Sequence, residues 1–179
     1  MSLKQWKKLS ESVLFKNPWW TYKRDDTVLP NGKRGVYHYV HTNGSSMVIP
    51  ILPDGKFVLV KQFRYLNNRE SIEFPCGGVK ELHTYEDTAK QELLEEAGYQ
   101  ASEWRLLGQF NPYNGVTNEL CRVYLAKQLE SFPSTPDETE EFEKIFLTSK
   151  EIEEKIHDGL IWDGMTIAAW TIAKSSFQH

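Results

Sequence analysis

The sequence predicts a mixed α+β fold, in which a mixed β-sheet carries helices on its faces. Short apolar runs bounded by turn residues recur along most of the chain, and this pattern is typical of strands. Only three segments show the apolar spacing or the capping residues of a helix, one within the run of strands and two at the C-terminus. With 179 residues, of which 40% are hydrophobic, the chain is long enough for one domain with a substantial core.

The first 45 residues suggest an N-terminal β arm that precedes the main domain, residues 46–179. The arm holds three of the six tryptophans, and residues 21–39 suggest two strands that turn at Pro30-Asn31-Gly32. Beyond the arm, residues 47–52 and 57–62 are apolar strand candidates, since a Pro-Asp-Gly turn separates them.

A glycine-rich turn and a regular helix follow. Residues 71–74 are expected to form a short strand that enters residues 75–78, where two glycines permit backbone conformations closed to other residues. Apolar residues then recur every four positions and predict a helix over residues 85–97, with Gly98 as its C-terminal stop. The residues of this apolar stripe are Tyr85, Ala89, Leu93 and Ala97.

The C-terminal half alternates strands and loops before it ends in two helices. Strands are expected over residues 104–110, 120–126 and 142–147, with an acidic loop over residues 133–141 before the last of them. The two predicted helices begin at Thr148 or Ser149 and near Asp163, respectively, because both places offer good N-terminal caps.

Composition excludes several classes of protein. The net charge is −4 with acidic and basic residues interspersed, so we expect no general binding of nucleic acid. No apolar run approaches the roughly 18 residues of a membrane span, and the N-terminus lacks the apolar segment of a signal peptide. Cys76 and Cys121 have no CxxC spacing, which favours reduced thiols in a soluble cytoplasmic protein over a disulfide.

Three glutamates share one face of the predicted helix. Glu95 and Glu96 follow Glu92 by three and four residues, and this spacing makes them neighbours on a helix surface. Their mutual repulsion destabilises the helix, and the helix dipole disfavours Glu96 near the C-terminal end. A bound Mg²⁺ or Mn²⁺ would reverse this effect, because these ions prefer oxygen ligands. The alternative is a solvated acidic face.

The segment from Gly77 to Tyr99 resembles the Nudix box, G-x5-E-x7-R-E-U-x-E-E-x-G-U, in which U is aliphatic or aromatic. The resemblance implies an α/β/α sandwich that binds divalent metal through Glu92, Glu96 and Glu95, with the carbonyl of Cys76 included. Glu95 is also a candidate catalytic residue. The positions that match the motif are Gly77, Glu92, Leu93, Glu95, Glu96, Gly98 and Tyr99.

Two positions depart from the box. His83 stands where the family has its first glutamate, and Gln91 stands where it has arginine. In the family the arginine organises the glutamates through charge-assisted hydrogen bonds, so we expect Gln91 to provide a weaker, neutral version. His83 either lines the site or lies exposed in the loop.

The resemblance extends toward the branch of ADP-ribose and nucleoside diphosphate sugar pyrophosphatases. Residues 61–64 and 73–78 resemble that branch's V-x-Q-[YF]-R strand and E-x-P-A-G-G segment. Arg64 then becomes a candidate ligand of the substrate pyrophosphate, with a surface ion pair as the alternative. Glu73 would face the phosphates or brace the box.

Residues 17–20 resemble the N-terminal start of the same branch. Trp19 and Trp20 could stack on a nucleobase, because aromatic side chains suit the faces of all bases. Packing in the core or in a dimer interface is the alternative for both tryptophans.

The acidic loop over residues 133–141 resembles the segment from which these pyrophosphatases supply a catalytic carboxylate. Glu138 and Glu140 align with the functional pair, and Glu141 is the next choice. A base outside the metal ligands is expected, because one carboxylate must orient or deprotonate the attacking water. A solvated charge run is the alternative.

The loop over residues 111–119 resembles the S-P-G-x-x-x-E segment that contacts substrate in ADP-ribose pyrophosphatases. Gly115 and Glu119 are in place, which makes Glu119 a candidate substrate contact or, alternatively, an exposed charge. The proline that marks ADP-ribose specificity falls on Asn114. Other substrates such as GDP-mannose therefore stay open.

The sequence as a whole predicts a Mg²⁺-dependent hydrolase that cleaves nucleoside diphosphate sugars to a nucleoside monophosphate and a sugar phosphate. The resemblance implies a homodimer joined through the β arm. Two alternatives remain at this stage: a Nudix enzyme for dinucleoside polyphosphates or coenzymes, and an inactive domain that senses a nucleotide.

Overall fold

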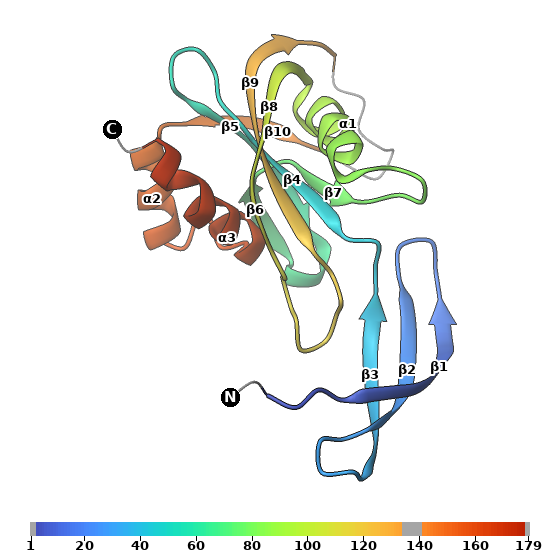
Figure 1. Ribbon diagram of the computed structural model, residues 1–179. Helices are drawn as coiled ribbons and strands as arrows, with labels where there is room; N and C mark the ends of the chain where they lie inside the picture. Colours follow the sequence, from blue (N-terminus) through green and yellow to red (C-terminus); the bar gives the residue numbers. More distant parts are fainter. Residues whose placement is uncertain (1–2, 134–140, 178–179) are drawn as a thin grey trace.

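The computed structural model describes residues 3–133 and 141–177. Figure 1 shows two parts: a body in which helices flank β-sheets, and an N-terminal arm of three strands that stands away from the body. The arm forms a sheet in the order β1-β2-β3, and all its strand pairs are antiparallel. Its strands are β1 (Lys7–Lys16), β2 (Thr21–Val28) and β3 (Arg34–His41).

The body contains a four-stranded sheet in the order β7-β4-β9-β8 and a three-stranded sheet in the order β10-β5-β6. β4 and β9 are parallel, while the other pairs are antiparallel, which confirms the predicted mixed sheet. The strands are β4 (Ser45–Pro50), β5 (Phe57–Arg64), β6 (Arg69–Glu73), β7 (Cys76–Gly78), β8 (Tyr99–Phe110), β9 (Cys121–Ser131) and β10 (Glu143–Leu147).

Helices cover both faces of the body (Figure 1), which confirms the predicted α/β/α sandwich. α1 (Tyr85–Ala97) packs Ala89 and Leu93 against Val48 and Val60 on one side. On the other side lie α2 (Ser149–His157) and α3 (Gly164–Ala173). Successive strand residues point to opposite faces, so β4 contributes to both cores.

The core under α3 is built around aromatic rings. Trp170 is 2% exposed, and its ring centroid lies 5.0 Å from Phe57 and 6.3 Å from Phe74. Its indole nitrogen donates to Glu153 on α2 at 2.6 Å, which satisfies the polar atom of an otherwise apolar side chain. This contact joins α3 both to the sheets and to α2.

The predicted helix over residues 85–97 has the observed bounds, because both of its ends carry specific signals. Thr84 and Asp87 form a reciprocal capping box at the N-terminus, and Gly98 takes a left-handed conformation with φ of 65° at the C-terminus. The other two helices also begin at predicted caps, Thr148 and Asp163, whose side chains accept backbone hydrogen bonds.

Several strands differ from the prediction. β1 and the three-residue β7 were not predicted, β8 begins earlier than residue 104, and β9 extends beyond residue 126. β1 has no buried residue, so its sequence carries none of the burial-driven alternation that reveals a strand. β7 forms only because β4 pairs with it, and sequence periodicity does not report such pairing.

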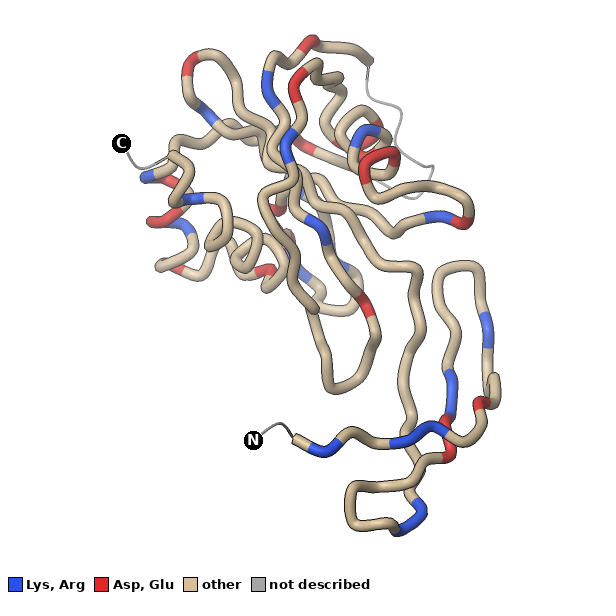
Figure 2. The backbone as a smooth tube through the Cα atoms, in the orientation of Figure 1, with Lys and Arg blue, Asp and Glu red and all other residues tan. Residues whose placement is uncertain are grey.

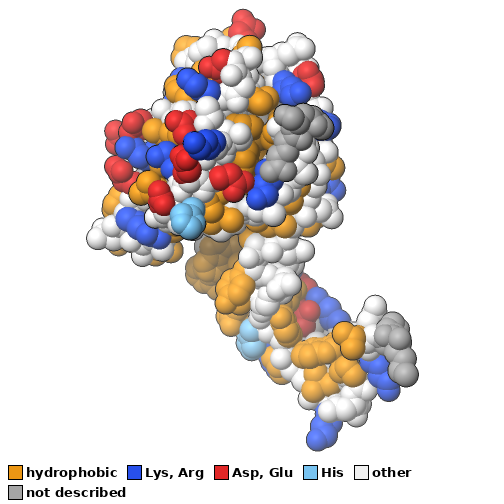
Figure 3. All heavy atoms as spheres, turned by 90° about the vertical axis from the view of Figure 1, so that its left-hand side faces the viewer, with side chains coloured by type: hydrophobic (Ala, Val, Ile, Leu, Met, Phe, Trp, Pro, Cys, Tyr) orange, Lys and Arg blue, Asp and Glu red, His pale blue; other side chains and the backbone are white. Residues whose placement is uncertain are grey.

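Acidic and basic residues are interspersed along the chain in both the arm and the body, as Figure 2 shows. No helix within the described ranges is long and apolar enough to cross a membrane. Hydrophobic side chains also reach the surface of the arm (Figure 3), where Val13 and Phe15 of β1 are 58% and 55% exposed.

Candidate active site

The site forms where β7 meets α1. The backbone N–H of Cys76 donates to Oε2 of Glu96 at 3.1 Å, although these residues are 20 positions apart. Glu96 is only 6% exposed, and its buried position near the helix end requires such a partner. β7 therefore holds the last glutamate of the helix in a fixed place.

Glu92 lies directly against the first glycine of the turn. A Cβ atom added to Gly77 would stand 2.0 Å from Oε1 of Glu92, whereas one added to Gly78 would meet nothing within 4 Å. Glycine at position 77 therefore leaves room for the Glu92 carboxylate, which occupies the volume that a side chain would take. Glu92 and Glu96 thus both reach the segment Cys76–Gly78 that carries the predicted carbonyl ligand.

Glu95 is held differently, by a neighbour on its own helix. The Gln91 side-chain amide donates to Oε1 of Glu95 at 2.8 Å. This is the neutral hydrogen bond expected where the family has arginine, and it organises one glutamate of the three.

The arrangement fits a divalent cation that completes its coordination with water and substrate. Within residues 3–133 and 141–177, no three His, Cys, Asp or Glu side chains form a ready-made metal site. Mg²⁺ commonly takes only one or two carboxylates and leaves its other positions to water and phosphate oxygens. Glu92 and Glu96, together with the backbone of β7, provide such a partial set.

Arg64 and Glu73 form an ion pair on the neighbouring sheet. The guanidinium donates through Nε to Oε1 of Glu73 at 2.8 Å and through a second nitrogen to Oε2. Glu73 is 3% exposed, while the Arg64 side chain is 45% exposed. The hydrogen bond to Glu73 raises the pKa of Arg64, and Asp163 and Glu96 add to this effect. Arg64 is therefore a fixed cation near the buried glutamate of α1.

The two cysteines are free thiols that lie beside this site. The hydrogen bond to Cys121, together with burial, raises the pKa of the Cys76 thiol well above its usual value. Burial and this hydrogen bond therefore favour the protonated form of the Cys76 thiol.

Comparison with known proteins identifies the family of this chain. Residues 41–165 match the NUDIX domain, and residues 6–40 match the nucleoside diphosphate sugar hydrolase N-terminal domain. The chain belongs to the Nudix family. The two matches confirm the predicted function at this level, a Nudix hydrolase that cleaves the pyrophosphate of nucleoside diphosphate sugars.

Individual relatives agree with the family. The chain is 31% identical to an ADP-ribose pyrophosphatase of Bacillus subtilis and 32% identical to a methanol dehydrogenase activator of Bacillus methanolicus, each over 81% of this chain and 80% of the relative. It is 28% identical to a GDP-mannose pyrophosphatase of Escherichia coli, over 80% of this chain and 78% of the relative. The crystal structure of an ADP compounds hydrolase shares the fold, with a TM-score of 0.85 at 19% identity over 98% of this chain and 95% of that chain.

The loop after β8 brings Glu119 to the Nudix fold's β4. Its Oε1 accepts a hydrogen bond from the Ser45 hydroxyl at 2.7 Å. Ser45 in turn pairs with Gly78 of β7, so the end of this loop lies next to the Nudix turn. The role of Ser45 could not be predicted from the sequence, because its hydrogen-bond partner Glu119 is 74 positions away in the chain.

Other predicted residues lie away from this centre or beyond the description. Trp19 is 80% exposed in the turn between β1 and β2, and Trp20 packs against Phe15 with 5.5 Å between ring centroids. His83 is exposed in the Nudix loop, and its backbone N–H donates to the Lys80 carbonyl at 3.1 Å. Two predicted candidates for the catalytic base, Glu138 and Glu140, lie outside the described residues.

Proposed function

We propose that this Nudix enzyme hydrolyses nucleoside diphosphate sugars with Mg²⁺, or alternatively Mn²⁺, held by Glu92 and Glu96. The observation that carries the proposal is the approach of both carboxylates to β7, one onto Gly77 and the other onto the Cys76 amide. A shared divalent cation would relieve the repulsion between two acidic side chains that one helix holds against a single strand.

Each glutamate has its own task in this proposal. Glu92, Glu96 and Glu95 would hold the metal together with the Cys76 carbonyl, and the hydrogen bond from Gln91 orients Glu95. When bound, the metal neutralises negative charge on the phosphoryl oxygens and positions the pyrophosphate. The products are a nucleoside monophosphate and a sugar phosphate.

A carboxylate from the acidic loop orients or deprotonates the attacking water. We assign this task to Glu140 or Glu138, with Glu141 as the next choice, because the helix glutamates are committed to the metal. Loops that close over a substrate commonly carry such residues. The assignment rests on the resemblance of this loop to the family.

Substrate contacts are proposed for residues on both sides of the metal ligands. Arg64 is held by Glu73, and its 45% exposed side chain can still meet a pyrophosphate oxygen. The burial of Glu73 favours a bracing task over direct contact with substrate. Glu119 would contact the sugar or ribose from its loop, and Trp19 or Trp20 would stack on the base.

The choice between ADP-ribose and GDP-mannose is left to experiment. The relatives include a pyrophosphatase for each of these compounds, at 31% and 28% identity. Asn114 stands where ADP-ribose pyrophosphatases have their marker proline, and this favours testing both compounds.

The arm, residues 1–45, supports a homodimer in which each arm reaches the Nudix domain of the other copy, residues 46–179. Its first strand has no buried residue, and it exposes large apolar side chains that a second chain would cover. A cytoplasmic location is proposed from the two reduced cysteines. Light scattering of the purified protein tests the dimer.

The central experiment is hydrolysis of ADP-ribose, GDP-mannose and related compounds with Mg²⁺, with the products identified by chromatography. We expect Glu92→Gln and Glu96→Gln to lower kcat/KM by about 100-fold or more, because each removes a metal ligand. Glu86→Gln on the same helix is the matched control, since Glu86 pairs with Lys90 at the exposed end of the helix. Thermal unfolding establishes that all three variants are folded.

Each outcome has a defined meaning. Tight binding of a nucleotide sugar without any turnover would contradict the hydrolase and indicate nucleotide sensing. Turnover that does not respond to either Gln substitution would contradict the proposed metal site while leaving the activity intact.

A further inference from the structure

The loop over residues 111–119 is joined to the arm by backbone hydrogen bonds. Val40 of β3 donates to the Val116 carbonyl at 2.9 Å, and the Asn118 N–H donates to the Val40 carbonyl at 3.3 Å. These contacts form a parallel bridge between Val40 and Thr117. The Tyr37 hydroxyl adds a contact further along β3, because it donates to the Gly115 carbonyl at 3.0 Å.

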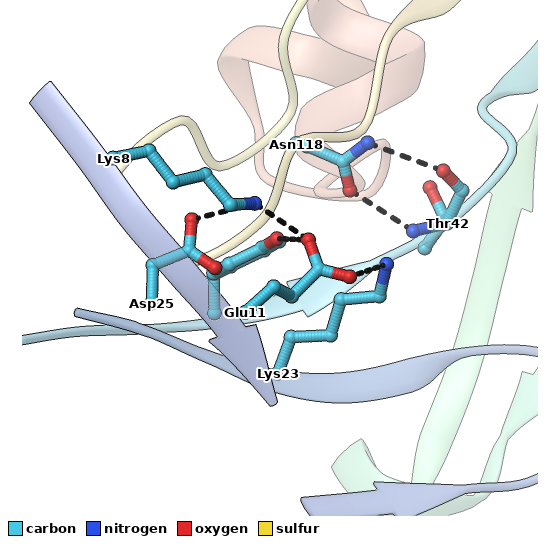
Figure 4. Close-up of polar contacts among 7 residues, drawn as sticks. Lys8, Glu11, Lys23, Asp25, Thr42 and Asn118 are labelled. Carbon is cyan, nitrogen blue, oxygen red and sulfur yellow. Dashed lines mark hydrogen bonds and ion pairs between the residues drawn. The ribbon is translucent and has the colours of Figure 1, made fainter. Parts of the chain in front are cut away.

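Asn118 extends this connection with its side chain. Its Oδ1 accepts from the Thr42 N–H at 3.0 Å, and its Nδ2 donates to the Thr42 carbonyl at 3.3 Å. Figure 4 shows the two bonds side by side, in the geometry by which one peptide group pairs with another. The amide thus satisfies both backbone polar groups of Thr42, where β3 has ended and β4 has not begun.

Residues 42–44, which include the Thr42 partner of Asn118, are also held by contacts from the opposite side. The Val79 N–H donates to the Gly44 carbonyl at 2.9 Å, and the hydroxyl of Tyr85, the first residue of α1, donates to the Asn43 carbonyl at 3.3 Å. A Cβ atom at Gly44 would lie 2.3 Å from that hydroxyl, and Gly44 has a φ of +98°. Residues 42–44 therefore lie tightly between the loop over residues 111–119 and the start of the Nudix helix.

The loop is coupled to the site through its last residues. Glu119, directly after Asn118, accepts from Ser45, and Ser45 pairs with Gly78 next to the glycine that contacts Glu92. Because Asn118 and Glu119 are neighbours in the chain, a shift of Asn118 relative to Thr42 would also displace the Glu119 carboxylate.

We propose that Asn118 is a positioning residue that fixes the loop over residues 111–119 against residues 42–44, which follow β3 of the arm. It thereby sets substrate affinity and selectivity. The inference rests on the proposed function, in which Glu119 of this loop contacts the substrate. Asn118 itself needs no contact with substrate or metal. Its effect passes through Thr42 on one side and Glu119 on the other.

The chemistry of the amide predicts how variants behave. Asn118→Ala removes both bonds to Thr42. Asn118→Asp keeps the acceptor for the Thr42 N–H but places a carboxylate oxygen, which cannot donate, against the Thr42 carbonyl. Tyr37→Phe removes only the bond to Gly115 and keeps the ring that packs on Trp6. Asn31→Ala is the matched control, since Asn31 likewise accepts a backbone N–H, that of Lys33, in a distant turn of the arm.

The test is steady-state hydrolysis of ADP-ribose and GDP-mannose with Mg²⁺. We expect Asn118→Ala and Asn118→Asp to raise KM by about fivefold or more, since two hydrogen bonds no longer order the loop, while kcat changes by less than about twofold. The ratio of kcat/KM for the two substrates should change as well. Tyr37→Phe should shift KM in the same direction by a smaller factor, and Asn31→Ala should leave both constants unchanged.

Hydrogen exchange of the ligand-free protein measures how strongly Asn118 orders the loop when no substrate is present. Residues 113–118 should exchange faster in both Asn118 variants than in the wild type and the Asn31 control. Faster exchange with unchanged KM would overturn the proposal, as would unchanged exchange. If Asn118→Ala fails to fold, Tyr37→Phe decides the question. If the wild type hydrolyses no nucleotide sugar, the proposed function is wrong. The proposed control of substrate affinity is then wrong as well, even if hydrogen exchange shows that Asn118 orders the loop.

Discussion

At the scale of single residues, the site depends on one glycine that makes room for one carboxylate. Motif matching explains why Gly77 is present, but the structure gives the physical cause, because Oε1 of Glu92 fills the place where a Cβ would stand. The neighbouring Gly78 has open space at the same position. Two adjacent glycines therefore differ in their tolerance of a methyl group.

This difference gives a prediction for a pair of alanine variants. Gly77→Ala should fold, because the clashing atoms are the far end of a flexible side chain, but Glu92 must leave its position. We expect the apparent Mg²⁺ affinity of Gly77→Ala to fall by about tenfold or more, whereas that of Gly78→Ala should equal the wild-type affinity. Titration of activity with Mg²⁺ measures both, and equal behaviour of the two variants would refute the spatial argument.

At the scale of elements, α1 owes its bounds to its caps. Four glutamates and one aspartate make this helix acidic, and three of the carboxylates repel one another near its C-terminal end. The capping box between Thr84 and Asp87 supports the opposite end, and bonds to Thr84 lower the pKa of Asp87. The helix therefore begins at a defined residue despite the repulsion farther along.

Loss of the cap should weaken the whole domain. Thr84→Ala is expected to cost about 1 kcal/mol and to lower Tm by about 2–4 °C. Thr171→Ala on α3 is the control, because Thr171 lies inside a helix, is exposed, and alanine is the better helix former there. Calorimetry compares the two variants, and equal losses of stability would argue against the capping role.

At the scale of the whole molecule, charged side chains link the three strands of the arm in addition to their backbone pairing. Glu11 of β1 accepts from Lys23 at 2.8 Å and from Tyr39 at 3.1 Å, and Lys8 bridges Glu11 and Asp25 (Figure 4). These contacts tie all three strands of the arm together. The hydrogen bonds from Lys23 and Lys8 lower the pKa of Glu11 to about 2 from an ordinary 4.5.

The lowered pKa predicts how the arm responds to acid. A carboxylate with a depressed pKa in the folded state stabilises the fold above its unfolded pKa, here 4.5, and loses this effect as the pH falls through about 2. Glu11→Gln should therefore be less stable than the wild type at pH 7, and the gap should narrow steadily below about pH 4.5.

Urea unfolding at several pH values measures this gap. Glu103→Gln in β8 is the control, because substitutions at exposed surface positions usually stay within about 0.5 kcal/mol of the wild type. A gap between wild type and Glu11→Gln that is the same at pH 7 and pH 3 would show that the network does not act through the charge of Glu11.

By itself the sequence determined the features that depend on local chemistry. Caps at Thr84, Thr148 and Asp163 and the stop at Gly98 set the helices, since each acts on backbone groups within a few residues. The glutamate spacing likewise predicted the acidic face for which metal binding is proposed, because helix geometry alone makes residues three and four apart neighbours.

Only the tertiary structure decided the contacts between distant segments. β1 escaped prediction because it buries nothing, and Ser45, Thr42 and Asn118 carry no signal until β4, the arm and the substrate loop meet. Hydrogen bonds between residues more than 70 positions apart depend on how the chain packs, which no local pattern encodes. The sequence thus defined the chemical groups of the site, whereas the packing of arm, loop and sheet decided how they are held.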